Sequence, residues 1–394
     1  MTTSVRFGLE VLAEHPRLLP ASGRLGLLQN QASVDDRMRL SCDVLAEIFP
    51  GRLQRLFSPQ HGFWSEQQAN MIESPDTRYE PLDLPVCSLY SVTRRPALQQ
   101  LQDLDLLLID LQDVGTRVYT FVWTMLECLR ACAEAGVPVC ILDRPNPLGG
   151  LIVEGPPITP GFESFVGNAA IPMRHGLTMA ELALLLNREL QVGADVRCIP
   201  MRGWQRADLW PDLGREWVPP SPNMPRWETC FVYPGQVLLE GLSLSEGRGT
   251  TRPFEICGAP ELVPERLLEL MNQQTSPGLV CRPLKFRPTF DKFAGHVCGG
   301  VALHVRQPSL VRSFHWTLRL LQAVRQLSQH NLQVLDPPYE YEYRRPPLDI
   351  LYGSQALRQA LTGEIDLDGA RLQQLAGVDE LAWFNRTAEI LLYD

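Results

Sequence analysis

Three loops of the chain bring carboxylate, amide, imidazole and guanidinium groups together with glycine and proline, which restrict the backbone around them. They span residues 58–63 (SPQHGF), 110–119 (DLQDVGTRVY) and 143–150 (DRPNPLGG). Each follows a short apolar run that is typical of a strand covered on both faces. Because ligands of an open parallel sheet bind beyond the carboxyl ends of its strands, the three loops together predict a site. The side chains in them that could bind or react are Gln60, His61, Asp113, Arg117, Tyr119, Asp143, Arg144 and Asn146.

Two later stretches carry further polar groups in a fixed backbone. The run 219–225 (PPSPNMP) predicts an extended loop that presents Ser221 and Asn223 as neutral hydrogen-bonding groups. The Gly-rich run 240–255 holds Glu246, Arg248 and Arg252, and its glycines let a ligand approach the backbone closely. A carboxylate, two arginines and several hydroxyls in one run suit an anionic, hydroxyl-rich molecule such as an acidic sugar. A structural ion pair between Glu246 and Arg248 is the simpler alternative.

Several other kinds of chemistry find little support in the motifs. No GxGxxG run follows a predicted strand, so we expect no dinucleotide cofactor. The residues 241–245 (GLSLS) do not form a GxSxG nucleophile elbow. His61, Asp110, Asp113 and His175 could in principle bind a metal, but their spacing fits no standard pattern, and we expect none. His175 precedes a predicted helix start, so we expect it to orient a loop or a ligand.

The elements that must position these residues alternate along the first half of the chain. The predicted strands span residues 24–30, 53–58, 104–111, 137–143 and 195–201. A helix is predicted over 120–135, ended by Gly136, and another begins at Thr178, where Thr178 and Glu181 form a capping box. Alternating strands and helices of this length predict an α/β fold with a Rossmann-like, doubly wound parallel sheet.

The character of the chain changes after about residue 205. Five prolines between 219 and 234 are expected to interrupt regular elements. A strand is predicted over 299–305, a helix over 311–329, and helices over 356–394 with breaks at Gly363 and Gly377. These segments predict a second, smaller α+β domain. We therefore divide the chain into a Rossmann-like domain over 1–210 and a C-terminal domain over 211–394, with the active-site cleft between them.

Composition narrows the partners and the compartment. The chain has 394 residues and a formal net charge of −9, which argues against a nucleic-acid partner. Of its 36 basic residues only Lys285 and Lys292 are lysines, and neither follows a glycine as a phosphate loop requires. No stretch of 18 apolar residues predicts a membrane span. Charged residues within 1–16 argue against export, and ten cysteines without a CxxC suit buried thiols of a reducing, cytoplasmic compartment.

From about Gly8 to its C-terminus the chain resembles the exo-β-N-acetylmuramidase family, which was long known only as a domain of unknown function. The family removes terminal N-acetylmuramic acid from peptidoglycan fragments. The resemblance implies a Rossmann-type domain and a smaller C-terminal domain with the cleft between them, and an amino-sugar or muropeptide ligand. It rests on motifs at residues 26–31, 110–119, 142–150, 153–156, 175–178, 219–225, 233–235, 240–255 and 258–260.

One position departs from the family pattern. The loop after the second strand is typically Pro-Glu-His-Gly in the family, and its glutamate is the proposed catalytic residue, whereas here the position is Gln60. A primary amide cannot exchange a catalytic proton as a carboxyl group does. Either another carboxylate acts instead, or the protein binds the sugar without cleaving it. The replacement carboxylates that we consider are Glu66, Glu73, Asp113 and Glu246.

The resemblance leaves three glycosidase mechanisms open. Two carboxylates can act by retention or by inversion, depending on their separation. Alternatively the acetamido group of the substrate acts as nucleophile, and we favour this route because it needs one acid and a polar orienting group such as Gln60 or Asp113. His61 would contact the sugar or tune the acid, and Arg117, Arg144 or Arg248 would receive the lactyl carboxylate. The competing hypotheses are a non-catalytic sugar-binding protein and, less favoured, a metal-dependent hydrolase.

Overall fold

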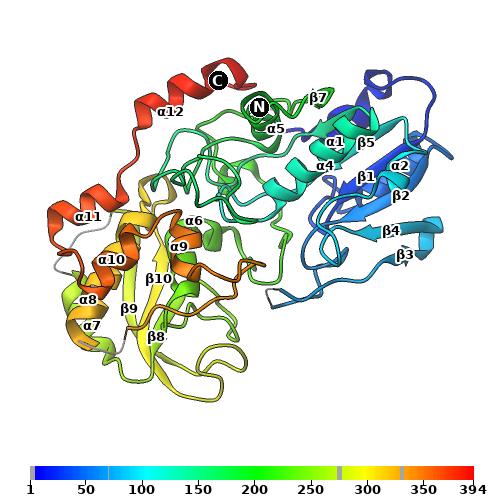
Figure 1. The fold of residues 1–394 in the computed structure, drawn as a ribbon. Helices are drawn as coiled ribbons and strands as arrows, with labels where there is room; N and C mark the ends of the chain where they lie inside the picture. The colour runs from blue at the N-terminus through cyan, green and yellow to red at the C-terminus, as the bar shows by residue number, and fades with distance from the viewer. Residues whose placement is uncertain (1–4, 70, 273–276, 329–331) are drawn as a thin grey trace.

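A computed structural model describes residues 5–69, 71–272, 277–328 and 332–394 (Figure 1). Within these residues the first half of the chain forms one sheet in the strand order β3-β4-β2-β1-β5-β6-β7. Neighbouring strands are parallel except β3 and β4, which pair antiparallel. The predicted doubly wound sheet is confirmed. Its strands are β1 (Leu25–Gln29), β2 (Leu53–Ser58), β3 (Thr77–Tyr79), β4 (Leu84–Ser88), β5 (Leu106–Asp110), β6 (Val139–Leu142) and β7 (Val196–Ile199).

Helices cover both faces of this sheet, which is why its central strands are apolar throughout. Ile109 of β5 packs in one apolar cluster with Leu126 of α4 (Phe121–Ala135) and with α5 (Met179–Glu189). Leu108, the next residue along β5, points to the other face and packs with α1 (Gly8–Glu14) and α2 (Ser41–Ile48). The short α3 (Leu98–Leu101) leads into β5. Figure 1 shows these helices on the two sides of the sheet.

Local signals set the ends of the helices that were predicted. Gly136 ends α4 with a φ of 69°, a left-handed conformation that glycine adopts without strain. At the start of α5 the Thr178 hydroxyl accepts from the Glu181 N–H at 3.3 Å, and the Glu181 carboxylate accepts from the Thr178 N–H at 3.0 Å. The predicted capping box is confirmed. The edge strand β3 and its neighbour β4 lie outside the predicted strands.

The second half of the chain is α+β, as predicted. Its strands β8 (Ile256–Ala259), β9 (Leu279–Phe286) and β10 (Cys298–Val305) form an antiparallel sheet in the order β8-β10-β9. The helix predicted from residue 311 is α8 (Ser313–Ser328), and its predicted end at 329 lies outside the described residues. The remaining helices are α6 (Trp227–Gln236), α7 (Pro264–Asn272), α9 (Pro347–Tyr352), α10 (Ala356–Thr362), α11 (Gly369–Ala376) and α12 (Glu380–Thr387).

Two sequence predictions about chain breaks have different outcomes. Gly363 and Gly377 end α10 and α11, as predicted. Pro234, by contrast, does not interrupt a regular element, because it lies inside α6. Proline costs a helix one backbone hydrogen bond, to the carbonyl four residues earlier. Here α6 tolerates that loss because its residues 229–236 are all buried, so tertiary packing outweighs propensity.

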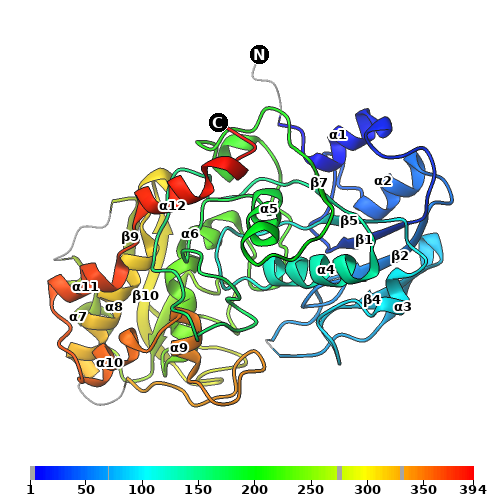
Figure 2. The ribbon, with the colours of Figure 1, turned by 45° about the horizontal axis from the view of Figure 1, so that its top comes forward.

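The two halves share apolar packing. One cluster of buried side chains runs from Ile109 in the large sheet through α4 to Leu321 in α8. Both ends of the described chain meet the segment 202–206: the Arg6 N–H donates to the Arg202 carbonyl at 2.9 Å, and the Arg206 N–H donates to the Asp394 carbonyl at 2.8 Å (Figure 2). The domain boundary at 210/211 stays a prediction.

Two further observations concern membrane spans and cysteines. None of the helices formed by the described residues is both long and apolar enough to cross a membrane. All ten cysteines lie in the described chain as free thiols, and eight of them are buried. Burial raises the pKa of these thiols, to about 12 for Cys140, so they are protonated and unreactive.

Candidate active site

A small pocket lies between loops from both halves of the chain, and we call it the central pocket. Its volume of about 30 Å³ is room for one or two water molecules. Six of the residues predicted from sequence line it, namely Gln60, His61, Tyr119, Ser221, Asn223 and Arg248. The other polar residues that line it are Thr120, Tyr233, Glu240, Tyr339 and Glu340.

The elements around the central pocket explain how distant residues meet there. Gln60 and His61 follow β2 directly, and Thr120 precedes the first turn of α4. Glu240 lies in the 3₁₀ helix η4 (Val237–Gly241), which continues α6. Glu340 comes from the loop before α9, which in both views reaches from the C-terminal half toward the loops after β2 (Figures 1 and 2). Each half therefore supplies part of the pocket.

Gln60 and Glu340 are joined directly, although 280 residues separate them in the sequence. The Gln60 amide N–H₂ donates to Glu340 Oε1 at 3.1 Å and to the Tyr90 hydroxyl at 3.0 Å. The Tyr90 hydroxyl donates to the other oxygen, Glu340 Oε2, at 2.7 Å. On the far side the Thr120 hydroxyl donates to Gln60 Oε1 at 2.6 Å. The amide of Gln60 is thus fixed at both ends, and both oxygens of Glu340 accept from neutral groups.

Glu340 sits at the tip of a tight turn with an unusual backbone. Tyr339 and Glu342 exchange two backbone hydrogen bonds of 3.0 and 2.9 Å, which leaves Glu340 and Tyr341 as the central pair of the turn. Both have positive φ angles, 43° and 68°, a combination that normally requires asparagine or glycine. The Tyr341 ring packs against Tyr90, and the Arg94 guanidinium lies over its face. Side-chain packing therefore holds the turn in place.

Glu240, the second carboxylate of the central pocket, has charged partners. Arg248 donates to Glu240 Oε1 at 2.7 Å, and the Tyr339 hydroxyl donates to Oε2. Behind Arg248 lies Glu246, which pairs with Arg248 at 3.4 Å and with Lys292 at 2.8 Å. The alternating signs of Lys292, Glu246, Arg248 and Glu240 make a buried chain of ion pairs. Glu246, predicted as a catalytic candidate, therefore supports the site from behind and does not line the pocket.

His61 is buried in a form that carries no charge. Its Nδ1 lies 2.6 Å from the Gln67 carbonyl, so Nδ1 carries the proton and Nε2 is left as an acceptor. Burial lowers the pKa of His61 to about 4, and the nearby Arg248 charge acts in the same direction. His61 is therefore a neutral hydrogen-bonding group near neutral pH.

The other predicted residues near the carboxyl ends of the strands do not reach the central pocket, because the fold uses them internally. Arg117 is fully buried and donates to four backbone carbonyls, of Pro156, Ile171, Leu351 and Tyr352. Asn146 bonds the backbone of Leu148 and Leu177. We call this group of residues the sheet-end region; it comprises Asp110, Asp113, Arg117, Asp143, Arg144, Asn146 and His175.

The remaining acids and the histidine of the sheet-end region also have structural partners. Asp113 accepts from the Gly115 N–H at 2.6 Å and lies 3.7 Å from His175 Nε2. Asp143 accepts from the Tyr393 hydroxyl at 2.6 Å and from the Ala180 N–H at 2.9 Å. Burial raises the pKa of Asp143 to about 7 despite these two donors.

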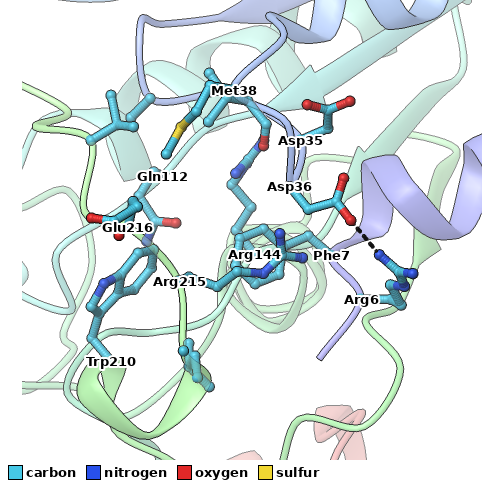
Figure 3. Close-up of a pocket in the computed structure, with 15 residues that line it drawn as sticks. Arg6, Phe7, Asp35, Asp36, Met38, Gln112, Arg144, Trp210, Arg215 and Glu216 are labelled. Carbon is cyan, nitrogen blue, oxygen red and sulfur yellow. Dashed lines mark hydrogen bonds and ion pairs between the residues drawn. The ribbon is translucent and has the colours of Figure 1, made fainter. Parts of the chain in front are cut away.

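Arg144 belongs to a different pocket, which we call the N-terminal pocket (Figure 3). Its volume is about 240 Å³. Arg144 forms a buried, forked ion pair with Asp110, and Arg215 pairs with Glu10. Both guanidinium groups lie over the Phe7 ring, at 5.4 and 4.5 Å from its centre. Figure 3 also shows Arg6 reaching Asp36, at 2.7 Å. Each arginine that lines this pocket is thus already matched by a carboxylate.

Three predicted or considered residues lie elsewhere. Glu66 and Glu73, in the loop after β2, are exposed and do not line the central pocket. Arg252 forms an ion pair with Glu255 at 2.6 Å, which takes up its guanidinium. The described residues contain no cluster of three or more side chains that could hold a metal ion.

Sequence reasoning missed Glu240, Tyr339 and Glu340. Glu240 is the first residue of the Gly-rich run 240–255. Within that run the neighbouring glycine favours Glu246 as the candidate. Glu340 follows no strand, so the rule about strand ends could not select it. The available signal was the segment 337–341 (PPYEY), an acid between tyrosines after a proline pair, similar in kind to the proline-fixed loop that was chosen for Ser221 and Asn223.

The chain is similar to characterised proteins along most of its length. Residues 25–228 match the family described as "Exo-beta-N-acetylmuramidase NamZ, N-terminal", and residues 231–393 match its C-terminal counterpart. The chain is 39% identical over 331 residues to the "Peptidoglycan beta-N-acetylmuramidase NamZ" of Bacillus subtilis (strain 168), a match that covers 84% of this chain and 80% of the relative.

Two solved structures have the same fold. Both are crystal structures of DUF1343 family proteins from Bacteroides fragilis NCTC 9343. The first has a TM-score of 0.88 and 28% identity and covers 99% of each chain. The second has a TM-score of 0.74 and 27% identity and covers 100% of this chain and 99% of the other.

Proposed function

The chain belongs to the exo-beta-N-acetylmuramidase family, and from that premise we propose that it is a glycoside hydrolase that releases terminal N-acetylmuramic acid from peptidoglycan fragments. One observation carries the assignment of the site: loops from both family-matched segments close on a pocket that contains two carboxylates and an arginine. Two carboxyl groups in unlike environments are what glycoside hydrolysis generally uses. A protein that only binds sugar would not need them.

We assign substrate contacts to the residues that line the central pocket. Arg248 is the cation among them, and its planar fork suits the lactyl carboxylate that distinguishes muramic acid from glucosamine. Ser221, Asn223 and Tyr119 offer hydroxyl and amide groups to the hydroxyls of the sugar. Neutral His61 accepts a hydrogen bond through Nε2. We assign the sheet-end residues no contact with the substrate, because they do not line the central pocket.

The free thiols support our proposal about the cellular compartment of the protein. Ten free cysteines in one chain suit a reducing environment, since an oxidising one favours disulfides. This supports a cytoplasmic enzyme that recycles fragments of the wall after their import. Fractionation of cells that express the native protein, followed by immunoblotting, would detect it in the cytoplasmic fraction; recovery in the periplasmic or extracellular fraction would contradict this placement.

The activity is tested with purified protein, a chromogenic N-acetyl-β-muramide and a small muropeptide. We expect release of the chromophore and, by mass spectrometry, free N-acetylmuramic acid from the non-reducing end of the muropeptide. The matching N-acetyl-β-glucosaminide, which lacks the lactyl group, is the control and should react poorly. Saturable binding of the muropeptide without turnover would leave a sugar-binding protein in place of the enzyme. Activity that persists after chelation would exclude the metal-dependent hydrolase.

A further inference from the structure

We propose that Glu340 is the proton donor of this enzyme and that Gln60 is the positioning residue that orients it. The inference rests on the proposed glycosidase function and assigns the acid that position 60 does not supply. Glu340 lines the central pocket, is only 3% exposed, and lies within hydrogen-bonding distance of the residue that replaces the expected glutamate. Glu340 thus offers a carboxyl group from the other half of the chain at a place close to position 60.

Burial is what favours the protonated form of Glu340. Its two oxygens contact a phenol and an amide, and no arginine or lysine of the described chain forms an ion pair with it. Burial raises the pKa of Glu340 and outweighs the hydrogen bonds from Tyr90 and Gln60, which lower it; the negative charge of Glu240 acts in the same direction as burial. A carboxyl group with a raised pKa can remain protonated near neutral pH and donate to a leaving group.

Glu240 shows the contrasting case within the same pocket. Its carboxylate receives Arg248 on one oxygen and the Tyr339 hydroxyl on the other. Arg248 therefore gives Glu240 a charged partner, which Glu340 does not have. Two carboxyl groups in such unlike surroundings mark the division between acid and electrostatic partner. Glu340 is the one suited to be the acid.

The backbone of the turn supports the assignment independently. Glu340 and Tyr341 both adopt positive φ, which costs about 1 kcal/mol or more for residues with a side chain. Glycine or asparagine would relieve that strain, yet a glutamate occupies the position that enters the pocket. Strained backbone of this kind is concentrated at functional sites, where the surrounding structure holds it. Here Tyr90 and Arg94 hold the turn through Tyr341.

An amide at position 60 fits this arrangement better than a second acid. A carboxyl group there would lie about where the Gln60 amide now donates to Glu340 at 3.1 Å. Two carboxyls at such a distance share one proton, and the proton would be divided between them. The amide only donates to Glu340, and Thr120 fixes which way it faces. Gln60 therefore orients the acid without competing for its proton.

The proposed step transfers one proton from Glu340 as the glycosidic bond breaks. Glu340 gives its proton to the glycosidic oxygen while the bond from that oxygen to C1 of the muramic acid breaks, and the electron pair of the bond stays with the oxygen. The acetamido carbonyl oxygen of the same sugar forms a bond to C1, the route that needs only one acid from the protein. Water then adds to C1, the acetamido group is released, and the proton lost by the water restores Glu340. The net reaction consumes one water molecule.

The test compares Glu340→Gln with Glu342→Gln on two substrates. Glu342 lies two residues further on and pairs with Arg345, outside the pocket. On the natural disaccharide linkage we expect kcat/KM to fall by about 10²–10⁴-fold for Glu340→Gln, the range of acid–base assistance, and by less than about twofold for Glu342→Gln. On a 2,4-dinitrophenyl N-acetyl-β-muramide, whose leaving group needs no proton, the loss for Glu340→Gln should be below about tenfold.

The outcomes distinguish a failure of the Glu340 assignment from a failure of the proposed glycosidase function. Equal losses on both substrates, or no loss on either, would overturn Glu340 as the proton donor while the wild-type activity stands. A wild-type protein that cleaves neither substrate would overturn the function itself. Thermal unfolding and the affinity for free N-acetylmuramic acid establish that each variant is folded. If Glu340→Gln fails to fold, Glu340→Asp replaces it and must show the same dependence on the leaving group.

The role of Gln60 is tested by the pH dependence of kcat/KM. Gln60→Ala removes a donor that lowers the pKa of Glu340. The alkaline limb of kcat/KM against pH should therefore move to higher pH, and kcat should fall on the disaccharide more than on the dinitrophenyl substrate. A loss of activity with an unchanged alkaline limb would mean that Gln60 only supports the loop.

Discussion

The sheet-end region and the central pocket contain the same kinds of residue, but the charged side chains have different partners in the two places. In the sheet-end region the arginines are matched within the fold, Arg144 by Asp110 and Arg117 by a ring of four carbonyls, and Asp143, which has neutral donors, lines neither of the two pockets. In the central pocket Glu340 is buried as deeply, yet its partners are neutral. A buried charge with a matching partner is stable and inert, whereas an acid held by neutral donors can give up its proton.

This difference bears on which of the two pockets is the active site. The N-terminal pocket is the larger, about 240 Å³ against about 30 Å³, and it lies at the carboxyl end of the sheet where a ligand is expected. Its arginines are nevertheless committed to Asp36, Asp110 and Glu10. Arg248 of the central pocket is paired as well, so the feature that sets the central pocket apart is Glu340, an acid held by neutral donors.

The largest expected effect comes from exchanging arginine for lysine in each region. Arg248→Lys keeps the charge but loses the fork that would hold the lactyl carboxylate. We expect kcat/KM on N-acetyl-β-muramides to fall about 10- to 100-fold, since a hydrogen bond to a charged group contributes about 1.5–3 kcal/mol. The reaction of the glucosaminide analogue should change little, so the ratio of the two rates measures the effect.

Arg144→Lys is the matched control for that experiment. It disturbs the buried pair with Asp110 and should lower the free energy of unfolding by a few kcal/mol. It should leave the preference for muramides over glucosaminides unchanged. If Arg144→Lys altered that preference and Arg248→Lys did not, the lactyl carboxylate would bind near Arg144 and not in the central pocket.

The second effect concerns stability and pH in the sheet-end region. Burial raises the pKa of Asp143 to about 7, so the native state holds a proton there that the unfolded chain releases near pH 4. This contribution to stability is complete below pH 4 and is lost as the pH rises to 7. Over that window the free energy of unfolding of the wild type should fall relative to Asp143→Asn by about 1.4 kcal/mol per pH unit.

Urea unfolding of both proteins from pH 4 to pH 8 measures this difference. Asp195→Asn removes an exposed carboxylate and is the control. A constant difference between the wild type and Asp143→Asn across the window would show that Asp143 is ionised in the native protein.

A smaller effect is expected when the family residue is restored in the central pocket. Gln60→Glu would place a second carboxyl group beside Glu340, and the two would hold one proton more tightly than Glu340 does alone. The alkaline limb of kcat/KM should move up by about one pH unit or more, with less than about a tenfold change at the optimum. Stopped assays across pH 5–9 with Gln60→Asn as the control would measure it. An unchanged limb would mean that residue 60 does not contact the acid during the reaction.

The smallest effect is expected at the rim of the N-terminal pocket. Arg6 and Asp36 form a partly exposed ion pair of 2.7 Å, and such pairs contribute about 0–1 kcal/mol. Asp36→Asn should change the free energy of unfolding by less than about 1 kcal/mol and leave kcat/KM unaltered. A clear loss of muramidase activity in this variant would place the reaction in the N-terminal pocket.

Much of the fold could be predicted because its signals are local. The run LQRLFS forms β2 with its predicted bounds, and Gly136 and the Thr178–Glu181 pair set helix ends by their own conformation and bonds. The strands β3 and β4 escaped prediction because they are short and less apolar: Pro85 lies within β4, and β3 has exposed residues. Pro234 in α6 shows the reverse, a local breaker signal that packing overrides.

The site could be predicted only in part because it depends on contacts between distant segments. The rule about strand ends selects Gln60, which lines the central pocket, but it also selects Asp143 and Arg144, whose polar atoms bond to Tyr393 and Asp110. The partners of those residues follow from tertiary packing, which no local pattern records. Glu340 lies 280 residues from Gln60 and follows no strand, so nothing in its neighbourhood connects it to the loop that it completes.

The small volume of the central pocket has a consequence for the entry of substrate. A space of about 30 Å³ holds one or two water molecules, so a sugar ring that binds there must displace them and rearrange the side chains that line the pocket. If this rearrangement limits turnover, a more viscous solvent, made with sucrose, should slow kcat on the fastest substrates first.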